Sequence, residues 1–245
     1  MKKLLFVVAT FLLLFGFALS QVNAQPVVVP NANESVEGDT SNIIPFSTIA
    51  ATSRYQQIYE STQFSECGNI VQVNFRFDQG RPEDSETYDD ISIQLSTTNV
   101  TPAALSDTFA ENIGLNVTTV YEGELIFSAP ACAIGPCPFD NIITLQTPFN
   151  YNPSDGNLLL DISIPQSPSY EAFDAVNNMP SITRRVFGFV SSEMGEVDDF
   201  GLVTQFVCEP VVSPIPTLSE WGLISIAVVL GIVGFMVIRR RKAAA

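Results

Sequence analysis

The sequence predicts an all-β protein, an antiparallel β-sandwich or jelly roll that carries one short helix. The first observation is period-two alternation, because the segment VQVNFRF places apolar side chains on one face, at Val71, Val73, Phe75 and Phe77. Residues 91–96 and 158–164 alternate in the same way, as strands with one buried face do. The second observation is turn chemistry between these segments, in stretches such as DQGRPEDSE and NPSDGN. No strand–helix–strand rhythm is visible, which argues against a parallel sheet.

The chain begins with the features of a secretory signal peptide. Two lysines precede an apolar run at residues 4–19, and a Val-Asn-Ala triplet that ends at Ala24 supplies a cleavage site of short residues. We expect residues 1–24 to be removed; a cut nearer Ser20, or an N-terminal anchor helix, is the alternative. Residues 25–49 mix Pro, Asn, Ser and acidic residues and are expected to form a loose N-terminal segment.

The sandwich domain is expected over residues 50–210. Besides the three segments above, we expect strands near residues 54–60, 117–127, 141–147, 183–191 and 201–208. The stretch TPAALSDTFAEN is the expected short helix, with Thr101 as its N-cap and Pro102 at its first helical position. About eight or more antiparallel strands in a region of this length are typical of a sandwich or a jelly roll.

The chain is strongly acidic, and its charge is unevenly distributed. The formal net charge of −15 includes six basic residues that lie in the two end segments. Residues 25–214 therefore hold five arginines, no lysine and 25 acidic residues, a formal charge of −20. Such a surface is a poor partner for nucleic acid and for anionic membranes. It is expected to keep the domain soluble outside the cell, and cation binding is the alternative.

The chain contains no histidine, which restricts the chemistry it can perform. Histidine is the commonest general base and metal ligand, so a Ser-His-Asp triad, a Cys-His pair and a His-based zinc site are all excluded. Paired carboxylates can hydrolyse glycans, but here most glutamates lie in polar stretches rather than beside aromatic residues. We therefore expect the protein not to be an enzyme.

Four cysteines, an even number in an exported domain, indicate disulfides formed in an oxidising compartment. Sequence alone permits three pairings. The spacing favours Cys132–Cys137, which closes the short loop CAIGPC, and Cys67–Cys208, which ties an early strand to the last one. A zinc site is the rival interpretation, but it would require C-x-x-C pairs that the chain lacks.

Acidic clusters are the only candidates for a metal site, since calcium takes six to eight oxygen ligands. The cluster considered for calcium comprises Asp78, Glu83, Asp84, Glu86, Asp89 and Asp90. Its spacing does not match a known calcium loop, so solvated loops are the favoured interpretation and structural calcium is the alternative. We expect no other cofactor.

The C-terminal end carries an apolar run followed by basic residues. Residues 222–238 are uncharged and would form about 25 Å of helix, just short of a hydrocarbon core of roughly 30 Å. Trp221 and the arginines that follow the run could anchor the two ends, so the sequence predicts a transmembrane helix with the domain outside and residues 239–245 as a basic cytoplasmic stub. A buried core helix is the alternative.

The residues before this run resemble a bacterial sorting signal. The octapeptide IPTLSEWG comprises Ile215, Pro216, Thr217, Leu218, Ser219, Glu220, Trp221 and Gly222. Its first seven residues lie in a linker at residues 211–221, and Gly222 begins the predicted helix. Motif, apolar helix and basic stub together closely resemble the IPTL-CTERM sorting signal of Gram-negative surface or secreted proteins. The resemblance implies cleavage near the motif by an exosortase, a membrane-embedded cysteine transpeptidase. A plain C-terminal anchor with a chance motif is the alternative.

The domain also resembles a known class. The stretches RYQQIYESTQF, QVNFRFD, DISIQLSTT, YNPSDGNLLLDI and GLVTQF are similar to a β-sandwich domain common in PEP-CTERM-type exported bacterial proteins, over most of residues 50–208. That resemblance implies a fold and no established activity. The cysteines are not part of its pattern.

We therefore expect an exported protein that is anchored in the membrane until an exosortase processes it, and that then resides at the cell surface or in the extracellular matrix. Its expected role is structural or adhesive, with envelope glycan or matrix as partners and nucleic acid excluded. A carbohydrate-binding module is the first alternative and a jelly-roll glycan hydrolase the second. An exposed row of aromatic residues would favour the module, and two carboxylates in a cleft would favour the hydrolase.

Overall fold

The computed structural model describes residues 24–47, 53–65, 67–166, 168–209 and 220–242. The chain divides into a β domain that ends at Val211 and a C-terminal unit that begins at Val212. The predicted signal peptide lies outside the described residues, apart from Ala24, so its removal stays a prediction.

The β domain consists of two large antiparallel sheets and one small one. The first sheet contains β3 (Ser53–Tyr59), β5 (Asp84–Thr98), β6 (Thr118–Ala129), β8 (Asn157–Ile164), β10 (Thr183–Gly188) and β11 (Glu196–Asp198), in the order β11–β10–β3–β8–β5–β6. The second contains β1 (Gln25–Val29), β4 (Asn69–Phe75), β7 (Asn141–Asn150) and β13 (Thr204–Glu209), in the order β1–β13–β4–β7. The third contains β2 (Thr40–Asn42), β9 (Phe173–Val176) and β12 (Gly201–Leu202), with β9 in the middle.

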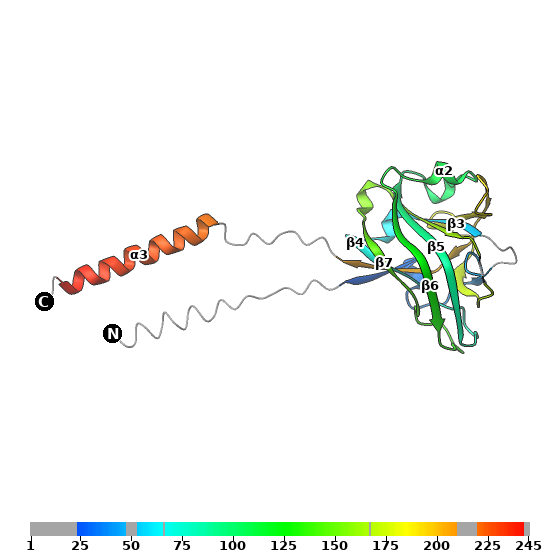
Figure 1. Cartoon of the computed structure of the whole chain (residues 1–245), viewed down its shortest axis with the longest axis horizontal. Coiled ribbons are helices and arrows are strands. Elements are labelled where there is room, and N and C mark those ends of the chain that lie inside the picture. The colour runs from blue at the N-terminus through cyan, green and yellow to red at the C-terminus, as the bar shows by residue number, and fades with distance from the viewer. Residues whose placement is uncertain (1–23, 48–52, 66, 167, 210–219, 243–245) are drawn as a thin grey trace. The chain divides into compact units, whose positions relative to one another are not determined.

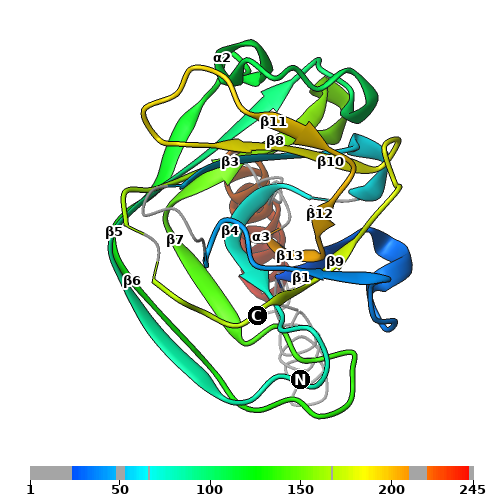
Figure 2. The same ribbon diagram turned by 90° about the vertical axis from the view of Figure 1, so that its right-hand side faces the viewer.

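The two large sheets form the layers of a sandwich, as the sequence predicts. Figure 2 shows β3, β8 and β10 lying across the domain from β4, β13 and β1. In Figure 1, β5 and β6 run side by side along one flank, in agreement with their long antiparallel pairing. Short 3-10 helices connect the strands, namely η1 (Asn31–Asn33), η2 (Ser61–Gln63), η3 (Pro102–Ala104) and η4 (Pro153–Asp155).

The core between the layers is rich in aromatic side chains. Phe46 contacts the rings of Phe75, Tyr88, Phe127 and Phe173, mostly edge to face. All five rings are almost completely buried and come from strands of all three sheets and from the segment after β2. Each such aromatic pair adds about 0.5–1.5 kcal/mol beyond the burial of its area, so this group helps to fix the two layers against each other.

A second, smaller core covers the outer face of the six-stranded sheet. Phe109 and Leu105, from the segment between β5 and β6, pack on Ile58, Leu159 and Val186. As a result, β8 is buried on both faces. The sequence predicts a strand at residues 158–164 with only one buried face, and that part of the prediction is wrong. The segment between β5 and β6, which we call the crossing segment, causes the difference, because it covers the face of the sheet that would otherwise be exposed to water.

The crossing segment differs in detail from the expected helix. The stretch TPAALSDTFAEN forms η3 and the four-residue helix α2 (Phe109–Asn112), separated by an irregular stretch. Thr101 makes no side-chain capping bond. The interruption is stabilised by Asn112, whose Oδ1 accepts from Ser106 N at 2.9 Å and whose Nδ2 donates to Ser106 O at 2.9 Å. These local side-chain bonds compete with a continuous helix.

The segment at residues 25–49 contains ordered strands, and its expected loose structure is wrong for the described part. β1 pairs with β13 from Gln25 opposite Cys208 to Val29 opposite Thr204, and β2 pairs with β9. Val28 and Val29 are buried. The domain boundary predicted at residue 50 therefore lies too late. The apolar run in β1 is too short to stand out among Pro and Asn residues.

Both disulfides have the pairing that the spacing predicts. Cys67, just before β4, is bonded to Cys208 near the end of β13. Cys132 is bonded to Cys137 in the loop between β6 and β7.

The C-terminal unit contains the helix α3 (Glu220–Lys242). Among the described residues, no helix has the length and apolar character that a membrane crossing requires. The predicted transmembrane helix at residues 222–238 is therefore corrected to a helix of 23 residues that does not meet this requirement. The physical reason is that its uncharged run is short, about 25 Å against a hydrocarbon core of roughly 30 Å.

Candidate functional site

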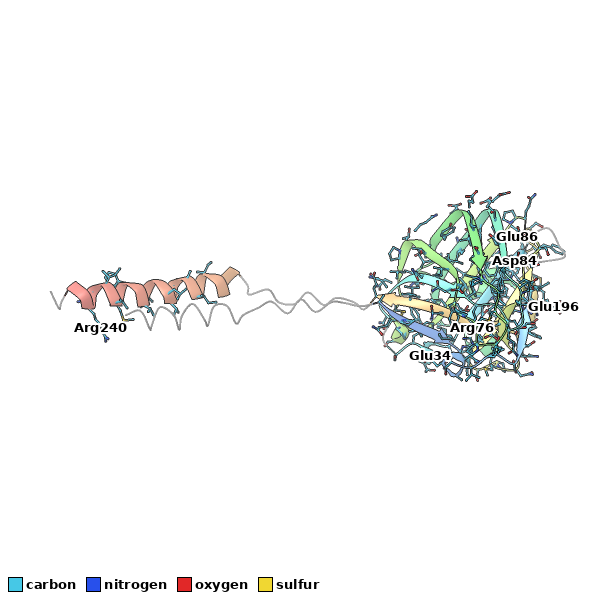
Figure 3. The ribbon with its side chains drawn as sticks, turned by 90° about the horizontal axis from the view of Figure 1, so that it is seen from below. Glu34, Arg76, Asp84, Glu86, Glu196 and Arg240 are labelled. Atoms are coloured by element: carbon cyan, nitrogen blue, oxygen red, sulfur yellow. A yellow bond between two sulfur atoms is a disulfide. The ribbon has the colours of Figure 1, made fainter. Side chains whose placement is uncertain are left out.

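The sorting segment follows directly on the last strand of the β domain. β13 ends at Glu209, and Glu220, Trp221 and Gly222 begin α3. The other predicted motif residues, Ile215, Pro216, Thr217, Leu218 and Ser219, lie outside the described residues. Along α3 the described apolar side chains, such as Val229 and Phe235, are exposed, and Arg240 projects from its last turns (Figure 3). Apolar helix and basic end thus occur in the predicted order.

The β domain carries a separate group of three carboxylates, Glu37, Asp78 and Asp174. One carboxylate oxygen of each lies within 4.8 Å of the others. Glu37 lies between η1 and β2, Asp78 follows β4, and Asp174 lies on β9. The group therefore joins three segments that are far apart in the chain. The loop between Cys132 and Cys137 also approaches it, because a Cβ on Gly135 would lie only 1.8 Å from Glu37 Oε2.

A buried arginine lies inside this acidic group. Arg76 is 1% exposed, and its Nε donates to Asp174 Oδ2 at 2.8 Å. Its Nη2 donates to the backbone oxygens of Asn33 at 2.9 Å and Val36 at 2.8 Å. Asp174 Oδ1 accepts from Gly38 N at 2.8 Å. The Arg76–Asp174 pair thus fastens the segment around η1 to the domain. We call Arg76, Glu37, Asp78 and Asp174 the acidic clamp.

Burial controls the electrostatics of the acidic clamp. It raises the pKa of Asp174 from 3.8 to about 6, although the neighbouring Arg76 guanidinium lowers it. Burial also raises the pKa of Glu37, and the nearby Asp78 carboxylate adds to this effect. Glu37 Oε1 accepts from Gln79 N at 2.9 Å, whereas no described residue donates a hydrogen bond to its buried Oε2. The negative charge of the Glu37 carboxylate is therefore poorly stabilised by its surroundings.

The acidic clamp fits an ion-pair network better than a calcium site. Both oxygens of Asp174 already accept hydrogen bonds, and Arg76 supplies the positive charge that a cation would bring. Asp78 accepts from Arg81 at 3.2 Å. Few carboxylate oxygens remain for the six to eight ligands of calcium. The donor set thus does not support the calcium alternative.

Of the six residues considered for calcium, only Asp78 belongs to the acidic clamp. The others are Glu83, Asp84, Glu86, Asp89 and Asp90, and four of these lie on β5 instead of in a solvated loop. Asp84 Oδ2 accepts from Glu171 N at 3.1 Å. Figure 3 shows Asp84 and Glu86 close to each other and away from Arg76. Sequence reasoning missed Glu37 and Asp174 because they are 137 positions apart and carry no shared motif.

The acidic clamp should make the domain more stable in mild acid. Because the folded-state pKa of Asp174 is raised, its stabilising contribution is complete below pH 3.8 and is lost as the pH rises through about 6. Glu37→Gln should place an amide donor near the Asp78 carboxylate and remove one titrating charge. We expect the free energy of unfolding of this variant to exceed that of the natural chain by about 1 kcal/mol at pH 7 and to differ little from it at pH 4. Urea unfolding at the two pH values measures the difference.

Glu34→Gln, at an exposed neighbouring position, is the matched control and should change stability by less than about 0.5 kcal/mol at either pH. A Glu37→Gln variant that is less stable than the natural chain at pH 7 would contradict this interpretation. So would a difference that is the same at both pH values.

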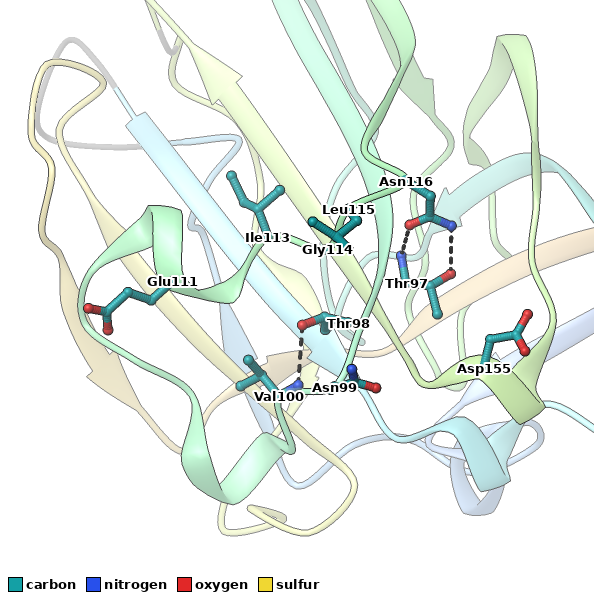
Figure 4. A pocket seen from close by; sticks show the side chains of 10 residues that line it. All are labelled: Thr97, Thr98, Asn99, Val100, Glu111, Ile113, Gly114, Leu115, Asn116 and Asp155. Carbon is teal, nitrogen blue, oxygen red and sulfur yellow. Dashed lines mark hydrogen bonds between the residues drawn. The ribbon is translucent and has the colours of Figure 1, made fainter.

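A cavity of about 570 Å³ lies between the end of β5 and the turn before β8. Figure 4 shows Glu111 and Asp155 on opposite sides of it, with Leu115 and Asn116 between them. Asn116 is already engaged, since its Oδ1 accepts from Thr97 N and its Nδ2 donates to Thr97 Oγ1. Ser106 Oγ donates to Glu111 at 2.6 Å. None of the ten described residues that line this cavity is aromatic.

The C-terminal segment is the part of the chain that similarity identifies. Residues 213–242 match the family model described as the IPTL-CTERM motif. This match covers the sorting segment and α3, and it agrees with the resemblance derived from the sequence. A search of the curated proteins finds no match to the chain. The IPTL-CTERM match and the two disulfides indicate an exported protein with a C-terminal sorting tag.

Proposed function

We propose that this chain is a substrate of an exosortase-type transpeptidase, which cleaves it near Ile215 to Gly222 and separates the β domain from α3. The single observation that carries the proposal is the IPTL-CTERM match at residues 213–242. The order of the elements supports it, because a compact, disulfide-bonded domain ends at β13 and the motif and helix follow directly. After processing, the domain resides at the cell surface or in the extracellular matrix.

The role proposed for the β domain itself is structural or adhesive, with no catalytic step. Its acidic charge keeps it soluble, and two disulfides suit it to an oxidising environment. Envelope glycan or matrix material is the proposed contact. The glycan-binding module gains little support, because five of the six tyrosines, Tyr55, Tyr59, Tyr88, Tyr151 and Tyr170, are buried in the core and cannot stack on a sugar. The hydrolase gains no specific observation either.

Substitution within the motif should block processing. Proline has a fixed φ and restricts the backbone of the residue before it, and Pro216→Ala removes both restrictions from the motif. If the enzyme recognises a chain restricted in this way, a loss of about 1.4 kcal/mol of transition-state binding lowers the cleavage rate about tenfold. The measurement is an immunoblot of cells in which an epitope follows Ala245, with a second antibody against the β domain. The uncleaved chain should accumulate.

Pro214→Ala is the matched control, because it changes the same residue type in the same segment outside the motif. Processing of this variant should remain within about twofold of normal. Equal processing of Pro216→Ala and Pro214→Ala would argue against recognition of the motif.

A further inference from the structure

The strand that leads to the sorting segment, β13, is paired on both sides and carries a disulfide near its end. β13 is an interior strand, paired antiparallel with β1 on one side and with β4 on the other. Cys208, one residue before the end of β13, is completely buried and is disulfide-bonded to Cys67. Cys67 lies two positions before the start of β4, so the end of β13 is bonded covalently to the start of its neighbour.

We propose that the Cys67–Cys208 disulfide is the mechanical junction through which load on the C-terminal segment enters the β domain. This inference rests on the proposed function, since a domain joined to an acceptor through its C-terminal segment is pulled at that end. Tension that reaches Glu209 acts next on Cys208. From there the covalent path continues to Cys67, and the hydrogen bonds of β13 to β4 are bypassed.

The bridge encloses most of the fold. It spans 141 positions, and β4 to β12 lie entirely within the enclosed part of the chain. In the described part of the chain, the elements before Cys67 are β1, β2 and β3 with the short helices η1 and η2. Tension between the two ends of the chain can therefore extend these N-terminal elements, whereas the enclosed strands lie off the covalent path between the two ends. The Cys132–Cys137 disulfide has no such effect, because its two cysteines are only five positions apart.

Single-molecule force spectroscopy on the full chain, with a handle at each end, tests this directly. Complete unfolding of the β domain should lengthen the molecule less in oxidising buffer than in reducing buffer. The expected difference is about 490 Å, because the bridge withholds 141 residues of about 3.5 Å each. Cys67→Ala/Cys208→Ala in oxidising buffer should lengthen like the reduced natural chain.

Cys132→Ala/Cys137→Ala is the matched control and should lengthen like the oxidised natural chain, because both residues lie within the part of the chain that Cys67–Cys208 encloses. The same lengthening in oxidised natural chain and in Cys67→Ala/Cys208→Ala would overturn the proposal. If that variant does not fold, the natural chain reduced after folding supplies the comparison. The measurement needs no exosortase, so a negative result would concern only the mechanical role of the disulfide. A failure of the proposed processing would be seen separately, as an unchanged C-terminus of the protein in cells.

Discussion

Replacing Cys67 and Cys208 together by alanine should lower the free energy of unfolding of the β domain by about 4–5 kcal/mol. The bridge closes a loop with a sequence separation of 141, and the loss of this constraint on the unfolded chain is worth about 5 kcal/mol in the chain-entropy model. Alanine is preferred to serine because both cysteines are buried and a hydroxyl would be left without a partner. Urea unfolding at pH 7 measures the loss.

The second disulfide provides the comparison for this experiment. Cys132 and Cys137 are five positions apart, so their replacement by alanine should cost only about 2 kcal/mol by the same relation. Equal losses for the two double variants would show that loop closure does not govern the effect. A loss below about 1 kcal/mol for the Cys67 and Cys208 variant would show that the bridge contributes little.

Asp174→Ala should be the most damaging single substitution of a charged residue, with an expected loss of about 3–5 kcal/mol. Arg76 is 1% exposed and Asp174 is fully buried, and their side chains are 2.7 Å apart. Removal of the carboxylate leaves a buried guanidinium without its counter-charge and also deprives Gly38 N of its acceptor. Thermal or urea unfolding measures the loss, and hydrogen exchange of residues 31–42 should rise with it.

Asp199→Ala is the matched control for this substitution. Asp199 pairs with Arg184 at 2.6 Å, but both side chains are partly exposed, at 37% and 25%. Exposed pairs of this kind contribute about 1 kcal/mol or less. If Asp174→Ala costs no more than Asp199→Ala, the acidic clamp does not hold the N-terminal segment to the domain.

Much of the β architecture follows from local alternation. The strands around residues 91–96 and 158–164 were predictable because their apolar side chains face the core at every second position. Alternation failed at residue 71, where a register irregularity between Ile70 and Gln72 places Ile70 in the core and leaves Val71 partly exposed. A bulge of this kind adds one residue to the strand and reverses the faces before it, without a clear sequence signal.

The acidic clamp could not be predicted, because its members meet only through the tertiary fold. Asp78 lies in an acidic stretch and was noticed for that reason, but its partners Glu37 and Asp174 are single acidic residues in unrelated segments. Arg76 alternates with the apolar residues Phe75 and Phe77, a position typical of a polar face, yet it is buried under the segment around η1. The disulfides were predictable because only a few pairings exist, and the sorting segment because its motif, apolar run and basic end are contiguous.

The mass of the mature protein, isolated from the cell envelope and the medium of cells with and without their exosortase, tests the central claim most directly. The proposed processing predicts a C-terminus within residues 215–222 when the enzyme is present, and a chain that still contains residues 223–245 when it is absent. The same intact C-terminus in both kinds of cell would contradict the proposal that this chain is an exosortase substrate.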